Sequence, residues 1–106
     1  MDDELVVLAD RDGLIRFWTA GAERTFGYTA AEAVGQTLEL IVPPEYRDAH
    51  WKGFRRAVES GNASAEGQSG PFPGRHAAGH VVEKTGRLAL LRRPDGGVIG
   101  AIVVFE

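Results

Sequence analysis

The chain has 106 residues, a net charge of −3 and no cysteine. A chain of this length buries roughly two thirds of its unfolded surface, so one core can hold it without a metal or a disulfide. The missing cysteine excludes thiolate zinc sites, cysteine nucleophiles and photoreceptors that form a cysteine adduct. Basic residues are interleaved with acidic ones, which argues against nucleic-acid binding. The acidic start, Met1-Asp2-Asp3-Glu4, and apolar runs of only strand length predict a cytoplasmic domain with no membrane insertion.

Two apolar runs near the N-terminus predict a β-hairpin. Residues 5–9 and 14–18 are joined by Asp10-Arg11-Asp12-Gly13, and an Asp-Gly turn between apolar runs is typical of a hairpin. Phe17 and Trp18 are adjacent in the second run, so they should point to opposite faces of the sheet, one inward and one outward. An exposed Trp18 on the outer face would favour dimerisation.

The middle of the chain predicts short helices followed by one long helix. Thr29-Ala30-Ala31-Glu32 has the form of a capping box, and Gly35 is suited to end that helix. The Pro43-Pro44 pair opens a helix over residues 45–60 that ends at Gly61. Several residues of this helix are spaced three or four positions apart, which places them on one inward-facing stripe. The stripe consists of Tyr46, Ala49, His50, Gly53, Phe54, Ala57 and Val58.

The last third of the chain predicts strands. Residues 62–74 are rich in Gly, Ser and Pro and indicate a loop or an irregular entry to a strand. A short strand ends near His76, and residues 77–79 form a turn. Two longer strands follow at 80–91 and 98–105, joined by a hairpin turn at 93–97. Strands at both ends of the chain with helices between them predict an α+β fold, in which helices cover one face of an antiparallel sheet.

Four segments resemble the PAS domain family of the bacterial S-box kind. They are residues 12–18, 22–36, 40–45 and 94–100. The resemblance implies a single PAS sensor domain over residues 1–106, with a five-stranded sheet in the order 2-1-5-4-3. It also implies that the domain belongs to a larger signalling protein such as a histidine kinase, a cyclase or a transcription regulator. Thr19 departs from the family, which most often has an asparagine there, and a hydroxyl makes fewer hydrogen bonds than an amide.

PAS domains commonly bind a small ligand between helices and sheet, and the resemblance implies the same here. The expected apolar lining consists of Phe26, Leu40, Tyr46, His50, Phe54, Leu88, Leu90 and Val103. The leading hypothesis is therefore a sensory module that binds a small molecule and regulates an attached effector through a homodimer. A rival hypothesis is a ligand-free dimerisation module with a packed core.

A second rival is a haem-based gas sensor. In rhizobial haem PAS domains a histidine on the long helix binds the iron, and an arginine six residues later contacts a propionate. His50 and Arg56 stand at corresponding positions, so His50 would be a metal ligand only with haem bound. The family's Ile-Gly-Ile-Gly-Arg stretch is missing, and only Arg75 can substitute for its basic residue. Otherwise His50 simply lines the pocket or bonds a carbonyl. Flavin ranks below haem because no flavin motif is present.

No pattern in the sequence indicates catalysis. Ser60, Ser64 and Ser69 lack a partnered histidine and aspartate at a readable spacing, so we expect no enzymatic activity from the domain itself. His76 and His80 flank a turn with no further ligand beside them, which favours exposed turn residues over a zinc site.

Overall fold

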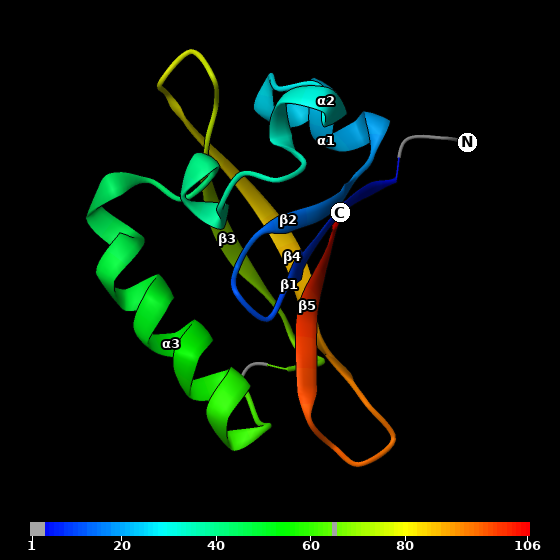
Figure 1. Cartoon of the computed structure of the whole chain (residues 1–106). Coiled ribbons are helices and arrows are strands. Elements are labelled where there is room, and N and C mark those ends of the chain that lie inside the picture. The colour runs from blue at the N-terminus through cyan, green and yellow to red at the C-terminus, as the bar shows by residue number, and fades with distance from the viewer. Residues whose placement is uncertain (1–3, 65) are drawn as a thin grey trace.

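Five antiparallel strands form the frame of the molecule, in a computed structural model that describes residues 4–64 and 66–106 (Figure 1). The strand order is β2-β1-β5-β4-β3, which confirms both the α+β class and the order that the resemblance implies. Both ends of the chain enter the centre of the sheet, where Val7 of β1 lies opposite Val103 of β5. The strands are β1 (Leu5–Asp10), β2 (Ile15–Trp18), β3 (Ser69–Arg75), β4 (Val81–Arg92) and β5 (Val98–Phe105).

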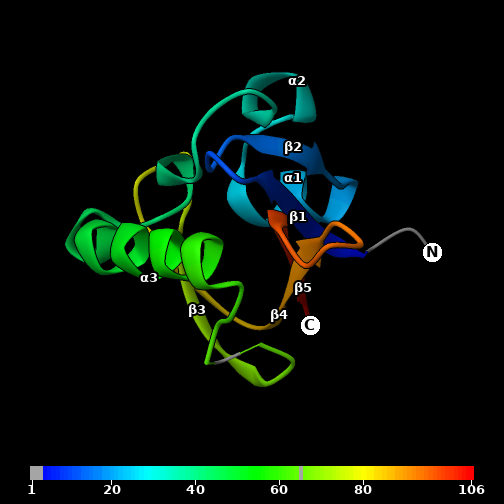
Figure 2. The same cartoon turned by 60° about the horizontal axis from the view of Figure 1, so that its bottom comes forward.

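The helices lie between β2 and β3 in the chain, and the longest of them, α3, runs along one side of the sheet (Figures 1 and 2). The expected capping box is present, because Thr29 accepts a hydrogen bond from the Glu32 amide (3.1 Å) and Glu32 accepts one from the Thr29 amide (2.8 Å). Gly61, with a φ of 77°, ends α3 as predicted. The helices are α1 (Ala20–Phe26), α2 (Ala30–Ala33), the 3₁₀ turns η1 (Leu38–Leu40) and η2 (Pro44–Tyr46), and α3 (Arg47–Ser60).

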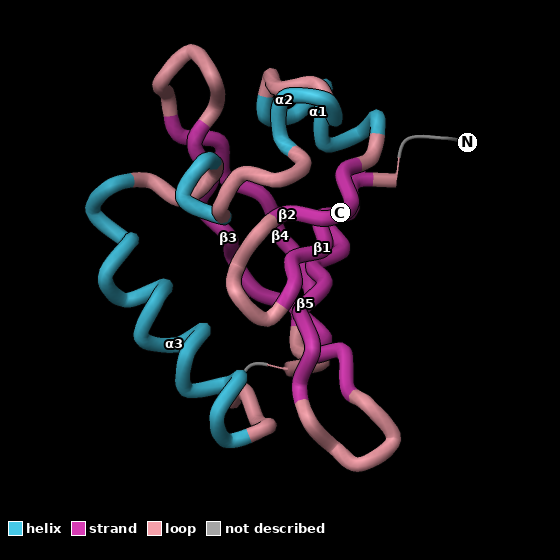
Figure 3. Tube along the Cα trace, in the orientation of Figure 1, coloured by secondary structure: helices cyan, strands magenta, loops and turns pink. Residues whose placement is uncertain are grey.

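Of the two alternatives for residues 62–74, the entry to a strand is confirmed for the second half, because β3 runs from Ser69 to Arg75 and matches the short strand expected to end near His76 (Figure 3). β3 pairs with β4 from Ser69 opposite Arg87 to Arg75 opposite Val81. Pro71 and Pro73 obscured where this strand begins, because proline cannot donate to a neighbouring strand. β3 lies at the edge of the sheet, where a strand needs a partner on one side only. Ala65, which also falls in the predicted loop, lies outside the described residues.

Trp18 is the inward aromatic of β2 and Phe17 the outward one. Trp18 is only 5% exposed and donates a hydrogen bond from Nε1 to the Tyr28 carbonyl (2.9 Å), whereas Phe17 is 52% exposed. The predicted alternation is confirmed, but the exposed aromatic that bears on dimerisation is Phe17. On the inner face Trp18 packs against Phe26, with ring centres 5.8 Å apart.

Thr19 ties β1 to α1 with a single oxygen. Its Oγ1 accepts hydrogen bonds from the Val6 amide (3.0 Å) and from the Ala22 amide (3.2 Å). The second bond also caps the N-terminus of α1. The threonine therefore joins strand and helix, although it departs from the family's usual residue. Within the described residues no helix is both long enough and apolar enough to cross a bilayer.

Candidate functional site

A cavity of about 780 Å³ lies between α3 and the inner face of the sheet. This volume falls within the range of about 300–1,000 Å³ that is usual for small-molecule sites. Its walls are mostly apolar because the inward residues of the central strands meet the inward stripe of α3 there. The sheet contributes Val7, Ala9, Leu88, Leu90, Ala101, Val103 and Phe105.

Most of the residues predicted for the site line this cavity, and two do not. Those that do are Phe26, His50, Phe54, Arg56, Leu88, Leu90 and Val103. Tyr46 is 48% exposed, because residues 44–46 form a 3₁₀ turn before α3 begins at Arg47 and so depart from the helical stripe. Leu40 packs against the main hydrophobic core instead of the cavity.

Sequence reasoning missed the residues that irregular segments bring to the cavity. Leu38 and Ile41 flank Leu40 and line the wall that Leu40 does not reach. They are three residues apart, and the three-residue period of a 3₁₀ turn places such residues on one side. Phe72 of β3, which the sequence did not assign to the site, also lines the cavity. Val7 and Ala9 of β1 also line the cavity, and the continuous apolar run over residues 5–9 contained no alternation that would identify its inward face.

The imidazole of His50 lines the cavity and is half-buried. Its Nδ1 is buried and has no hydrogen-bond partner among the described residues. The ring stacks on Phe54, with centres 5.9 Å apart, and meets Trp51 edge-on at 4.8 Å. Burial lowers the pKa of His50, and the nearby carboxylate of Glu39 offsets part of that effect. A neutral imidazole held this way can hydrogen-bond a ligand or coordinate a metal.

The N-terminal half of α3 is anchored outside the cavity. Trp51 does not line the cavity; its Nε1 donates a hydrogen bond to the Glu39 carboxylate (2.7 Å). Its ring also lies against Gly13 of the β1–β2 turn, where an added Cβ would come within 2.5 Å of the ring. Arg47 donates to the backbone carbonyls of Val42 (3.1 Å) and Glu39 (3.3 Å). These contacts fix the start of the helix against the η1 segment.

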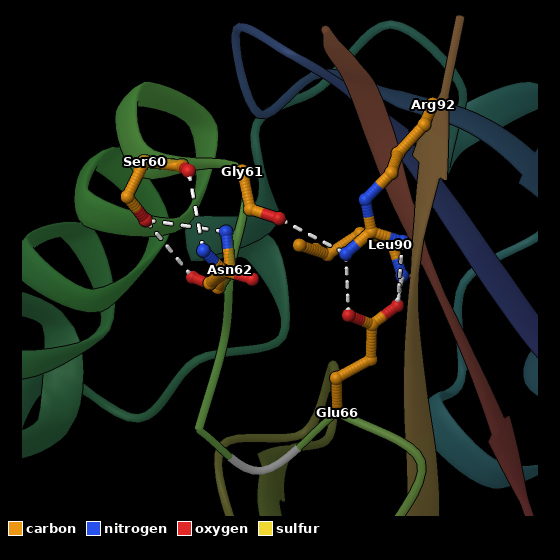
Figure 4. Close-up of polar contacts among 6 residues, drawn as sticks. All are labelled: Ser60, Gly61, Asn62, Glu66, Leu90 and Arg92. Atoms are coloured by element: carbon orange, nitrogen blue, oxygen red, sulfur yellow. Dashed lines mark hydrogen bonds and ion pairs between the residues drawn. The ribbon is translucent and has the colours of Figure 1, made fainter. Parts of the chain in front are cut away.

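The C-terminal end of α3 is anchored by a second set of polar contacts (Figure 4). Arg92 of β4 donates a hydrogen bond to the carbonyl of Gly61 (3.0 Å) and holds the Glu66 carboxylate through two further bonds (2.6 and 3.1 Å). Glu66 in turn accepts from the Leu90 amide (2.8 Å). The hydrogen bonds from Arg92 and Leu90 lower the pKa of Glu66. The helix is therefore held at both ends and passes over the cavity between them.

His76 and His80 form a stacked pair at the β3–β4 turn, with ring centres 4.5 Å apart and planes at 16°. Nδ1 of His76 accepts a hydrogen bond from the Ala78 amide (2.9 Å) and so stabilises the turn. In the described part of the chain, no three or more His, Asp or Glu side chains gather closely enough to hold a metal ion.

Two proteins similar to part of this chain are sensor proteins. The chain is 32% identical over 63 residues to "Oxygen sensor protein DosP" of Escherichia coli (strain K12), an alignment that covers 59% of this chain and 8% of DosP. It is 32% identical over 47 residues to "Sensor protein FixL" of Bradyrhizobium diazoefficiens, which covers 44% of this chain and 9% of FixL. The chain thus spans less than a tenth of the curated relatives it matches.

Solved structures share the fold over nearly the whole chain. A PAS domain from Colwellia psychrerythraea superposes with a TM-score of 0.81 at 21% identity, covering 98% of this chain and 85% of that one. The PAS domain of the RpfR quorum-sensing receptor of Cronobacter turicensis, solved in complex with C12:0, gives 0.73 at 18% identity, covering 99% and 93%. The sequence model of the PAS fold family matches residues 2–106. The chain therefore belongs to the PAS family, whose domains are sensory and generally non-catalytic.

Proposed function

We propose that this PAS domain senses a small, largely apolar molecule in the cavity beneath α3. The cavity itself carries the proposal: about 780 Å³ with mostly apolar walls and one unpaired imidazole nitrogen. An apolar hollow forfeits dispersion contacts that a bound molecule would restore. A ligand of matching shape would therefore bind and stabilise the fold.

Signalling would follow from the position of α3. The helix is anchored near Trp51 and near Gly61, and His50, Gly53 and Phe54 face the cavity between these points. A ligand beneath this stretch favours whichever arrangement of α3 it contacts better, and the populations shift by that difference in affinity. We propose that residues 1–106 act as one cytoplasmic sensory module of a longer signalling protein, and that α3 and the sheet pass the change to an attached effector.

The outer face of the sheet supports a homodimer as part of this proposal. Phe17 lies opposite Leu8, and Leu8 lies opposite Ile102, so an apolar row crosses β2, β1 and β5. Val104 on the same face of β5 is 45% exposed. An apolar face of this kind is suited to packing against a second copy of the chain.

Filling the cavity tests the proposal. Gly53 is an exposed residue at the edge of the cavity, and a Cβ at this position meets no atom within 4 Å, so a larger side chain fits here and can narrow the cavity. We expect Gly53→Leu to fold and to lose binding of an apolar probe such as 1-decanol by tenfold or more. Gly53→Ala is the matched control, because it removes the helix cost of glycine, about 0.5–1 kcal/mol, and leaves the cavity open.

Calorimetric titration with 1-decanol and thermal unfolding of the three proteins provide the measurement. Both variants should unfold at a higher temperature than the parent protein, and only Gly53→Leu should lose probe binding. Equal binding by Gly53→Leu and Gly53→Ala would contradict a site beneath α3. A failure of all three proteins to bind probes of varied shape would favour the ligand-free dimerisation module.

A specific observation also favours haem as a second candidate. His50 lines the cavity, and burial lowers its pKa and so keeps the imidazole in the neutral form that coordinates iron. Arg56 lines the same cavity and is the group that would hold a propionate. Haem, when bound, would supply an iron centre for a diatomic gas. The similarity to DosP, whose name describes an oxygen sensor, supports this candidate.

A visible spectrum of protein produced with haem supplied tests it. Haem ligation predicts a Soret band that His50→Ala shifts or removes and that His80→Ala, a change at the exposed turn, leaves unaltered. A protein with no Soret band, or with a band that His50→Ala does not change, would exclude haem bound through His50.

A further inference from the structure

Electric charge is distributed very unevenly around the cavity. Arg56 is the one charged side chain among the described residues that line it. The polar residues Ser60, Asn62 and Ser64 follow Arg56 at the end of α3 and just beyond it, so polarity gathers at one end. The rest of the wall is apolar except for His50, which lies six residues before Arg56, about 9 Å along the helix axis.

Arg56 is also available for a ligand. Its side chain is exposed, so it borders both the cavity and the solvent. Within the described residues it has no ion pair or hydrogen bond, whereas Arg92 is paired with Glu66 and Arg47 is bonded to backbone carbonyls. The guanidinium is a planar donor that matches a carboxylate or a phosphate.

Negative groups near this end are largely occupied. The Glu66 carboxylate is held by Arg92, which also donates to the Gly61 carbonyl at the negative end of the α3 dipole. Glu59 borders Arg56 on the outer side of the helix, together with the two cations Lys52 and Arg55. Lys52, Arg55 and Arg56 therefore outnumber Glu59 along this part of α3, and the interior of the cavity holds no counter-charge from the described residues.

We propose that the ligand of this site is an amphiphile with a single anionic group, such as an aliphatic carboxylate, whose charged end binds Arg56 at the mouth of the cavity. This inference rests on the proposed ligand-binding function and adds the chemical class and the orientation of the ligand. An anion is costly to remove from water, so it stays at the exposed rim, while the apolar chain fills the interior beneath α3.

Three probes with one chain length test the charge preference: decanoate, 1-decanol and decyltrimethylammonium, each titrated calorimetrically below its micelle concentration. We expect decanoate to bind about fivefold more tightly than 1-decanol, the effect of one partly exposed charge pair, and the cation to bind more weakly than either. The preference should shrink as salt is added. Arg56→Gln should bring decanoate and 1-decanol to equal affinity. Arg55→Gln, which removes a neighbouring cation outside the cavity, should keep the preference.

The outcomes separate this inference from the proposed function. Tight binding of both decanoate and 1-decanol with no preference, or a preference that Arg56→Gln leaves intact, would overturn the anionic class while an apolar-ligand site remains. Binding of none of the three probes would overturn both. If Arg55→Gln as well as Arg56→Gln lost the preference for decanoate, the preference would come from the combined positive charge of α3. That result would overturn the specific role of Arg56.

Discussion

The imidazole of His50 is half-buried and its Nδ1 has no hydrogen-bond partner among the described residues. The sequence predicted that this residue faces the cavity, because the apolar stripe of α3 identifies the helix face. It gave no means of predicting the missing partner, which depends on carbonyls and carboxylates that other segments bring close. The proximity of Glu39 arises from the turn before α3 and not from any periodic pattern.

The lowered pKa of His50 predicts how acid affects stability. The unfolded chain binds a proton near the ordinary value of 6.5, and the folded protein binds it only at lower pH. The contribution of His50 is therefore complete above pH 6.5 and is lost as the pH falls toward the folded pKa. We expect the free energy of unfolding of the parent protein to fall from pH 7.5 to pH 5 more steeply than that of His50→Phe.

Urea unfolding of the two proteins over this pH range measures the difference. His76 and His80 are present in both proteins, so the comparison isolates the change at residue 50. Parallel pH profiles would show that burial does not penalise the charged form of His50.

At the scale of elements, the sequence predicted the bounds of structures that have a regular period and left open the start of a strand that rests on pairing. Residues 98–105 alone suffice to predict β5, because an apolar run with turn residues before it is a local signal. β3 contains Pro71, Pro73 and two glycines, and only its position beside β4 makes it a strand. The 3₁₀ turn at residues 44–46 likewise displaced Tyr46 from the expected stripe, since the helix begins one residue later.

Glu66 protects the part of β4 that extends beyond β3. Pairing with β3 ends at Arg87, so the backbone of β4 from Leu88 onward has a free side. The Gly67 amide donates to the Leu88 carbonyl (2.8 Å), and the Glu66 carboxylate accepts from the Leu90 amide (2.8 Å). A side chain thus takes the place of a missing strand at this edge.

Glu66→Ala should expose that edge. We expect hydrogen exchange of the Leu90 amide, followed by NMR, to become about tenfold faster, which is the expected effect of losing one bond to a charged acceptor. Glu66→Gln keeps a hydrogen-bond acceptor without the charge, so the exchange rate of the Leu90 amide in this variant should lie between the rates in the parent protein and in Glu66→Ala. Unchanged exchange in Glu66→Ala would mean that the amide is protected by something other than this carboxylate.

At the scale of the whole molecule, the two faces of the sheet differ in what covers them. The inner face is covered by helices and carries both the core and the cavity. Among the described residues of the outer face, an apolar row is left uncovered, and Phe17 at the β2 end of this row is 52% exposed. The sequence predicted that Phe17 and Trp18 part to opposite faces, but two adjacent aromatic residues give no indication of which one turns inward. The Tyr28 carbonyl, which pairs with the indole of Trp18, decides it.

The proposed homodimer predicts that a charge at Phe17 separates the subunits. Phe17→Glu should weaken self-association by tenfold or more in sedimentation experiments, because a buried aromatic anchor becomes a desolvated carboxylate. Val34→Glu is the control, since Val34 is also exposed (42%) but lies beyond α2 and not in the sheet. A parent protein that sediments as a monomer at high concentration would contradict the dimer.

The hollow beneath α3 has a further consequence for the lifetime of the protein. A cavity of about 780 Å³ is a packing deficit for as long as nothing occupies it, and a molecule that binds only the folded state adds stability in proportion to its concentration. We expect the unliganded domain to open more often and to be degraded faster by proteases. The amount of the protein in a cell would then rise with the supply of its ligand, so turnover itself would report the signal.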